Sequence, residues 1–191
     1  MASYHLSFNK SSEIKYDDQF DFLTYKVRFI EEDIAPVLGA FISYENNLVY
    51  VKGGLALRNI NSRFSYVDYL NYDDLNPKEV IKETRSILLP LEAGLRVENI
   101  KFGAGPTLAF HYSENKIFEG IDEFEERRRK FDSGFHINIS YELNKLQFEL
   151  MYEQRFHGVG DYFYYRGDQK AFQQASQYIG LSLAYVITVN R

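Results

Sequence analysis

The stretch that decides the fold is residues 143–152, which read LNKLQFELMY. After the Asn144-Lys145 pair, apolar and polar residues alternate almost without a break. One side of an extended chain would carry Leu146, Phe148, Leu150 and Tyr152, and the other Gln147, Glu149, Met151 and Glu153. A period of two predicts a β-strand with one apolar face and one polar face.

The same alternation recurs along the chain and predicts eight strands, at about 2–10, 35–45, 48–60, 86–98, 100–113, 131–143, 146–157 and 176–190. Short turns near 46, 99 and 144 alternate with long polar stretches at about 11–34, 61–85, 114–130 and 158–175. Strands of about ten residues, tilted by about 40°, span about 25 Å of membrane. We therefore predict an all-β fold: one domain, 1–191, forming an eight-stranded antiparallel up-and-down transmembrane β-barrel. Its short turns would be periplasmic, its four long loops extracellular, and its first and last strands paired.

Some local signals do not fit a simple run of strands and loops. Asn76-Pro77 places proline where a helix begins, which predicts a short helix at about 76–81. The charged run at 125–130 is either a short helix with i,i+4 pairing or a solvated loop. Pro36, Pro90 and Pro106 fall at or inside predicted strands, where proline is disfavoured.

Composition narrows the class of protein. All aromatic residues are Tyr and Phe, 17% of the 191 residues, and mean hydropathy is -0.37, which suits a barrel with only every second strand residue apolar. No apolar run approaches the roughly 18 residues of a membrane helix. The lack of Cys excludes disulfides, thiolate sites and a lipidated Cys, and a net charge of -5 argues against nucleic acid as a partner. No signal peptide is visible, so we interpret the chain as a mature form with Met1 added for expression.

The distribution of residues over the two faces indicates which face is inside. One face is nearly all Leu, Ile, Val, Phe and Tyr, whereas small and charged residues share the other. Eight strands leave an interior just wide enough for side chains, so small residues mixed with ion pairs suit a narrow polar lumen. The predicted lumen charge network is Lys52, Arg58, Glu92, Arg96, Lys101, His136, Glu142, Glu149, Glu153 and Arg155. The alternative is a soluble lipocalin-like carrier, in which the apolar face would line a ligand cavity.

Catalytic and metal signals are weak. His5 and Ser7 share a strand face, as do His111 and Ser113, but any strand gives such pairs. We predict no catalytic residues, no metal and no cofactor, with an outer-membrane lipid A-modifying enzyme as an alternative. The Asp17-Asp18 and Asp73-Asp74 pairs lack the spacing of a calcium loop, and the tripeptide at 166–168 (RGD) is too short to predict adhesion.

The long polar stretches carry the residues that we expect to contact partners. Aromatic side chains there suit a membrane-interface girdle or a partner surface, and arginines suit lipopolysaccharide phosphates. The loop interaction candidates are Tyr66, Tyr69, Tyr72, Arg127, Arg128, Arg129, Tyr162, Phe163, Tyr164 and Tyr165.

Several segments together resemble a known family. These are ILLPLEAG at 87–94, FGAGP at 102–106, the hairpin from Gly134 to Leu150, and YIGLSL at 178–183. They are similar to the small outer-membrane β-barrel proteins of Bacteroidota, often described as PorT-like, over nearly the whole chain. The resemblance implies a barrel in a Gram-negative outer membrane, and one relative is linked to type IX secretion. The chain departs from the usual barrel ending, because it closes on Val189-Asn190-Arg191 and not on an aromatic residue.

We therefore expect a non-enzymatic outer-membrane protein that acts through its extracellular loops. Its expected partners are outer-membrane lipid, lipopolysaccharide, and another outer-membrane or secretion-system protein.

Overall fold

Where the structure describes the chain, it forms β-strands joined by turns and irregular segments. The computed structural model describes residues 1–9, 11–17, 23–69, 75–115, 124–127, 130–158, 162–166, 168–171 and 175–187. The strands are β1 (Ala2–Ser7), β2 (Ser12–Asp17), β3 (Leu23–Ile34), β4 (Val37–Glu45), β5 (Val49–Asp68), β6 (Lys78–Val97), β7 (Ile100–Glu114), β8 (Phe124–Arg127), β9 (Phe131–Leu143), β10 (Leu146–Gly158), β11 (Tyr162–Tyr165), β12 (Asp168–Ala171) and β13 (Ala175–Tyr185). Within these ranges no helix has the length and apolar character needed to cross a bilayer.

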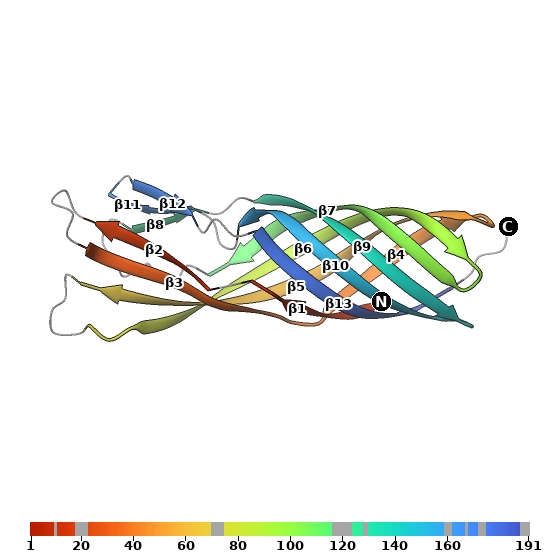
Figure 1. Cartoon of the computed structure of the whole chain (residues 1–191), viewed down its shortest axis with the longest axis horizontal. Helices are drawn as coiled ribbons and strands as arrows, with labels where there is room; N and C mark the ends of the chain where they lie inside the picture. Colours follow the sequence, from red (N-terminus) through yellow and green to blue (C-terminus); the bar gives the residue numbers. More distant parts are fainter. Residues whose placement is uncertain are drawn as a thin grey trace.

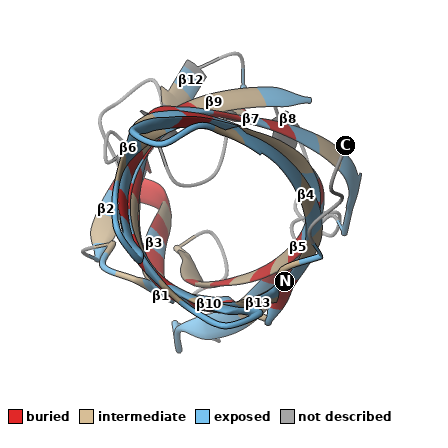
Figure 2. Cartoon of the chain, turned by 90° about the vertical axis from the view of Figure 1, so that its right-hand side faces the viewer, coloured by how far each residue is buried: buried red, intermediate tan, exposed pale blue. Residues whose placement is uncertain are grey.

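Strands from both ends of the chain close into an antiparallel ring (Figure 2). Hydrogen-bonded neighbours follow the order β1, β13, β10, β9, β7, β6, β5, β4 and back to β1, which makes eight strands. β1 and β13 pair from Ala2↔Leu183 to Ser7↔Tyr178, so the predicted pairing of the first and last strands is confirmed.

The three predicted short turns are confirmed. They join β4 to β5, β6 to β7 and β9 to β10. Glu98 and Asn144 both adopt a φ of 55°, which tight hairpins require. Asn46 Oδ1 accepts hydrogen bonds from the backbone N–H groups of Leu48 (3.0 Å) and Val49 (2.9 Å). All three turns lie at the same end of the molecule, on the right in Figure 1.

The long strands β5 and β6 continue past the ring into an elongated second part, on the left in Figure 1. There they pair from Asn59↔Arg85 to Tyr66↔Lys78. β3 adds to this half of β5, and β2 adds to β3. β12, β11 and β8 form a separate three-stranded sheet. We call this part the extension: β2, β3, β5 from Asn59, β6 up to Arg85, and the three-stranded sheet.

The extension corrects several sequence-based predictions. The stretches 11–34 and 61–85 are largely strand and not loop, and the count of eight strands is wrong for the whole chain, although eight form the ring. The helix at 76–81 is wrong because β6 begins at Lys78 and Val80 pairs with Phe64. The helix or loop predicted at 125–130 is also wrong for 125–127, which belong to β8, while 128 and 129 lie outside the described residues. In each case, cross-strand pairing prevails over a local turn or helix signal.

The prolines mark interruptions in the sheet. Pro36 lies in the break between β3 and β4, both of which pair with β5. Pro90 and Pro106 lie inside β6 and β7, and the β6–β7 register has no partners between Pro90↔Thr107 and Ala93↔Ala104. Proline has no N–H to donate, so the ladder skips at these points.

The ring and the extension have opposite polarity. In the ring, aliphatic and aromatic side chains such as Leu57, Leu95 and Phe148 are exposed, and charged side chains are buried inside. In the extension, Phe29 and Phe64 are 0% exposed and form a core with residues of β2 and β11, while Arg28 and Asp33 face outward. On β5 and β6 the change falls near the pair Asn59↔Arg85.

Candidate functional site

All ten predicted charge-network residues lie on the inward face of the ring. They occupy alternate positions on β5, β6, β7, β9 and β10, because a strand turns every second side chain to the same side. They group into three clusters along the ring, which we name the rim, middle and upper clusters, starting from the short turns.

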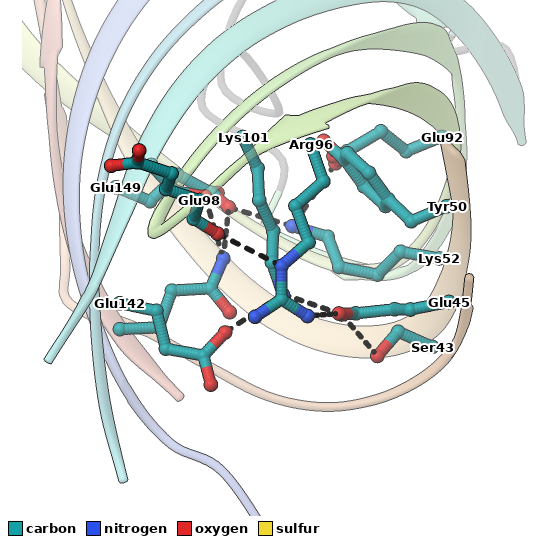
Figure 3. Close-up of polar contacts among 12 residues, drawn as sticks. Ser43, Glu45, Tyr50, Lys52, Glu92, Arg96, Glu98, Lys101, Glu142 and Glu149 are labelled. Carbon is teal, nitrogen blue, oxygen red and sulfur yellow. Dashed lines mark hydrogen bonds and ion pairs between the residues drawn. The ribbon is translucent and has the colours of Figure 1, made fainter. Parts of the chain in front are cut away.

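The rim cluster lies beside the short turns and joins Arg96, Lys101, Glu45 and Glu142. Arg96 Nη1 lies 2.7 Å from Glu45 Oε2, and Lys101 Nζ lies 2.5 Å from Glu45 Oε1. Lys101 Nζ is also 3.0 Å from Glu142 Oε2. Figure 3 shows Arg96 and Lys101 reaching Glu45 from neighbouring strands. Two cations therefore face two carboxylates, and the cluster is neutral.

The middle cluster centres on Lys52, which bridges two carboxylates. Its Nζ lies 2.6 Å from Glu149 Oε2 and 3.0 Å from Glu92 Oε2. Glu92 also accepts hydrogen bonds from Tyr50 and from Asn138 Nδ2, the latter at 2.7 Å. His136 Nε2 lies 3.6 Å from Glu92. Four strands, β5, β6, β9 and β10, are tied together by these contacts.

The upper cluster places Glu153 between two guanidinium groups. Arg58 Nη1 lies 3.2 Å from Glu153 Oε2, and Arg155 Nε lies 2.7 Å from Glu153 Oε1. Arg155 Nη1 also contacts Asp132 Oδ2 at 2.5 Å. Arg58 Nε and Nη2 and Arg155 Nη2 have no hydrogen-bond partner in the described part of the chain. The cluster therefore holds more buried donors than acceptors.

The interior of the ring holds these clusters together with a buried apolar cluster of Ile34, Val37, Ala56, Ile60, Leu88, Ala109 and Tyr178. A cavity of about 30 Å³ remains between the middle and upper clusters, bordered by His136, Glu92 and apolar side chains including Phe41 and Leu88. A cavity of this volume holds no more than about three water molecules. Buried charges must be paired to be tolerated, and here they also occupy the space that a channel would need. Along the described strands, the interior is a plug.

Several plug residues escaped the sequence prediction. Tyr50, Asn138 and Asp132 each lie an even number of positions from a predicted network residue of the same strand, and therefore on the same face. Strict use of the period of two would have found them. Glu45 ends the predicted strand at 35–45, next to the short turn at Asn46-Asn47, and is not among the predicted network residues. Its role as the shared partner of Arg96 and Lys101 depends on strands brought together only by the fold.

The histidines pair with different hydroxyl groups from those considered in the sequence. His5 Nε2 lies 3.0 Å from Ser3 Oγ, while Ser7 donates to Glu32. His111 Nδ1 lies 2.6 Å from Ser86 Oγ on the neighbouring strand, and not beside Ser113. Thr107 Oγ1 lies 2.8 Å from His136 Nδ1. The last pair borders the 30 Å³ cavity, which has no room for an acyl chain.

The loop candidates fall mostly inside the extension or outside the described residues. Phe163 and Tyr165 are buried in its core, which corrects their assignment to a contact surface. Tyr66 packs against that core, Tyr69 is half-buried, and Tyr164 donates to Gln169 Oε1 at 2.9 Å. The backbones of Tyr162 and Arg127 belong to β11 and β8. Tyr72, Arg128 and Arg129 lie outside the described residues.

The short motifs gain no support as sites. Arg166 stacks on Tyr165 with its Cζ 5.4 Å from the ring centroid, and Gly167 lies outside the described residues, as do Asp18, Asp73 and Asp74. In the described ranges, no group of three or more His, Asp or Glu side chains is placed to hold a metal ion.

Comparison with known proteins assigns no family. No family model matches the chain, and no curated protein or solved structure matches it. The PorT-like resemblance therefore stays a prediction.

Proposed function

We propose that the chain is a non-enzymatic integral outer-membrane β-barrel protein with a salt-bridged plug. The ring would cross the bilayer, and the extension would project from the cell surface as an interaction module. The observation that carries this proposal is the exposed apolar face around a ring whose buried interior is ionic. Water would favour the reverse arrangement, whereas lipid favours this one.

The height of the apolar belt supports the proposal. On β6 the outward residues are apolar from Ile87 to Val97, which is ten steps along the strand. At about 3.3 Å per residue and a tilt of about 40°, this corresponds to about 25 Å along the membrane normal. That is the height of the apolar band of outer-membrane barrels. Above it, three of the four outward residues of the strand are charged, namely Arg85, Glu83 and Glu79, and the fourth is Ile81.

The change of polarity along a single strand supports a change of solvent. Beyond Asn59↔Arg85 the side chains of β5 and β6 still alternate, but the inward side now reaches an apolar core through Phe64 and Val80, with Ser62, Lys82 and Thr84 also buried, and most outward residues of β6 are charged. A soluble β-structure has this pattern, because its core must exclude water. The extension is therefore suited to an aqueous environment and presents its charged face for contacts with lipopolysaccharide or a protein partner. A link to type IX secretion is part of this proposal only through the family resemblance.

Single-cysteine labelling tests the proposal directly, because the natural chain has no Cys. Cysteines would replace, one at a time, outward residues of β6: Leu95, Leu91 and Ile87 in the belt, and Glu83 and Glu79 in the extension. After reconstitution in lipid vesicles, each would carry a polarity-sensitive dye. We expect blue-shifted emission at the first three positions and water-like emission at the last two.

A control at Ser86, which is buried inside the ring, identifies misfolded protein by its labelling in the native state. Water-like emission at all five outward positions, in folded protein that stays monodisperse without detergent, would refute membrane insertion. That result would favour the alternative function, a soluble lipocalin-like carrier. Altered lipid A mass spectra in cells expressing the protein would instead favour the enzyme alternative.

A further inference from the structure

The outer edge of β2 is unpaired in the part of the chain that the structure describes. β2 stands at the end of the main sheet, and β3 pairs with only one of its edges. Glu13, Lys15 and Asp17 on this strand are exposed, whereas Ile14 and Tyr16 are buried in the core of the extension. An unpaired strand edge is a template on which another strand can pair.

The direction of the backbone groups of β2 follows from its neighbours. Tyr69 N–H donates to Thr24 O at 2.9 Å, so Thr24 and every second residue after it on β3 turn to β5, and those between them turn to β2. By the same alternation, Glu13 and Lys15 turn their N–H and C=O groups to the unpaired edge. Lys170 Nζ reaches the Lys15 carbonyl oxygen there at 2.5 Å, and a carbonyl can accept a second hydrogen bond. In the described ranges, neither of the two N–H groups has a hydrogen-bond partner.

The side chains of this edge are complementary to a second copy in one antiparallel register. A two-fold axis at Glu13 or at Lys15 would set that residue opposite its own copy, and like charges opposite each other destabilise a sheet. An axis at Ile14 sets Glu13 opposite Lys15 on both sides of the axis and keeps the whole strand paired. An axis at Tyr16 would also join opposite charges, Lys15 and Asp17, but it would pair only 15–17. The register centred on Ile14 is therefore favoured.

Lys15 is the cation best placed to change partners. Glu13 contacts Lys26 Nζ at 3.0 Å, Arg28 Nη2 at 3.4 Å and Lys15 Nζ at 3.5 Å. The Lys15 side chain is also the most exposed of the three, at 59%. Three cations thus share one carboxylate, and Glu13 of a second copy would give Lys15 another.

The direction of β2 decides how two paired copies would be oriented. β2 runs along the long axis of the molecule, away from the ring (Figure 1). A two-fold axis that makes two β2 strands antiparallel is perpendicular to them, so it places the two rings at opposite ends of the pair. Rings at opposite ends belong in two bilayers that face each other, and not in one.

The strand lengths allow this arrangement. Ile14 pairs with Val27, and seven residues further along β3, Ile34 pairs with Ile60 just above the ring. At about 3.3 Å per residue, this level lies about 23 Å from Ile14. β2 continues from Ile14 only to Asp17, which adds about 10 Å. The described tip of one copy therefore ends short of the ring of the other.

We propose that the chain pairs with a second copy of itself through the β2 edge and thereby joins two facing membranes. Glu13 of each copy would contact Lys15 of the other, and the two main sheets would become continuous. The pairing rests on β2 alone. The joining of membranes rests on the proposed function, because it requires that the rings are inserted.

Clustering of phosphatidylcholine vesicles tests the proposal. Vesicles that carry the natural protein should cluster, as measured by light scattering, and the protein in maltoside micelles should sediment as a dimer. Glu13→Lys and Lys15→Glu should each weaken the dimer by at least about ten-fold, because the two-fold axis repeats each like-charged contact. Glu79→Lys, an exposed change on β6, should leave it unchanged.

Mixing the two variants is the matched control for folding. A Glu13→Lys chain has cations at both positions and a Lys15→Glu chain has carboxylates at both, so a mixed pair regains opposite charges. Vesicles of either variant alone should stay dispersed, and the mixture should cluster. Only folded chains in the proposed register can give this result.

A backbone change tests the ladder separately from the charge. Lys15→Gln and Lys15→Pro both remove the ammonium group, but only proline also removes the N–H at the edge. Because that N–H turns away from β3, its loss breaks no ladder bond within one copy. Lys15→Pro should therefore dimerise at least about ten-fold more weakly than Lys15→Gln.

Natural protein that the cysteine labels show to be inserted, but that leaves vesicles dispersed, would overturn the proposal. So would a mixture of Glu13→Lys and Lys15→Glu that clusters no better than its components. Dimers in micelles that follow these charge changes, without insertion into vesicles, would support the β2 pairing and refute the proposed function instead.

Discussion

At the scale of single residues, the plug is held by charges that depend on one another. Glu153 contacts both Arg58 and Arg155, and Glu92 accepts from Lys52, Tyr50 and Asn138. Removing one member of a buried pair leaves the other charge without compensation, which costs more than the pair itself contributes. Single substitutions in the plug should therefore have large effects on stability.

Glu153→Gln is predicted to destabilise the folded protein by about 3–5 kcal/mol, because two buried guanidinium groups lose their shared carboxylate. The measurement is the free energy of unfolding in denaturant, with the protein in vesicles. Glu79→Gln, an exposed change on β6, should alter it by less than about 0.5 kcal/mol. A loss below about 1 kcal/mol for Glu153→Gln would contradict a plug that depends on this contact.

Glu13 gives a residue-scale prediction for the extension. The hydrogen bond from Lys26 (3.0 Å), followed by the charges of Lys26, Lys15 and Arg28, lowers the pKa of the Glu13 carboxyl from its ordinary 4.5. A lowered pKa in the folded state means that ionised Glu13 stabilises the protein above about pH 4.5. This contribution is lost as the pH falls through the folded-state pKa.

Glu13→Gln should therefore reduce stability by about 0.2–1 kcal/mol at pH 7, as expected for a surface pair. The difference between the two proteins should disappear at low pH, once Glu13 is protonated in the folded state. Urea unfolding curves measured across the acid range would show this. A difference that stays constant down to pH 2 would show that the effect of the substitution is not electrostatic.

At the scale of elements, β5 and β6 combine two structures in one hairpin. Each strand is 20 residues long, and its lower half belongs to the ring while its upper half carries the extension. The core of the extension joins Phe64 on β5 to Phe29 on β3 and Phe163 on β11, with ring centroids 5.6 and 6.1 Å apart. The ring does not contribute to this core, so the two halves should respond separately to mutation.

Phe64→Ala is predicted to weaken the extension by about 3–5 kcal/mol, because it opens a void among fully buried aromatic side chains. Hydrogen exchange should accelerate in β3 and β11, while β9 and β10 keep their protection. Phe148→Ala removes an exposed aromatic residue of the ring and is the matched control. Uniform acceleration across β9 and β10 in Phe64→Ala would mean that ring and extension unfold as one unit.

At the scale of the whole molecule, the same side of β6 faces two environments. Leu91 and Ile81 are both exposed and both outward, but Leu91 lies in the middle of the belt and Ile81 lies in the extension. Under the proposed insertion, only Leu91 contacts lipid. The cost of a charge at the two positions should therefore differ.

Leu91→Arg is predicted to lower stability in vesicles by up to about 2–4 kcal/mol, the cost of an arginine near the bilayer midplane. Ile81→Arg should change it by less than about 0.5 kcal/mol, because that face is hydrated. The same pair of variants measured in detergent-free buffer provides the comparison. Equal effects of the two substitutions in vesicles would argue against a lipid boundary between these positions.

The ring could be predicted largely from alternation, because a period of two is a local property of an extended chain. The short turns near Asn46, Asn99 and Asn144, the pairing of the terminal strands, and the inward parity of the charged residues all follow from it. The extension was missed because its strands alternate equally well but bury the opposite kind of residue. In 23–34, Tyr25, Val27 and Phe29 face a core that β2, β5 and β11 complete.

The sequence by itself determined which side chains share a face, and hence that apolar and ionic residues are kept on opposite sides of each ring strand. Only the tertiary structure decided which carboxylate meets which cation, where the polarity changes along β5 and β6, and which edge of β2 stays unpaired. The physical reason is the separation along the chain over which each interaction acts. Alternation acts between adjacent residues, whereas ion pairs such as Lys52–Glu149 and packing such as Phe64–Phe163 join positions about a hundred residues apart.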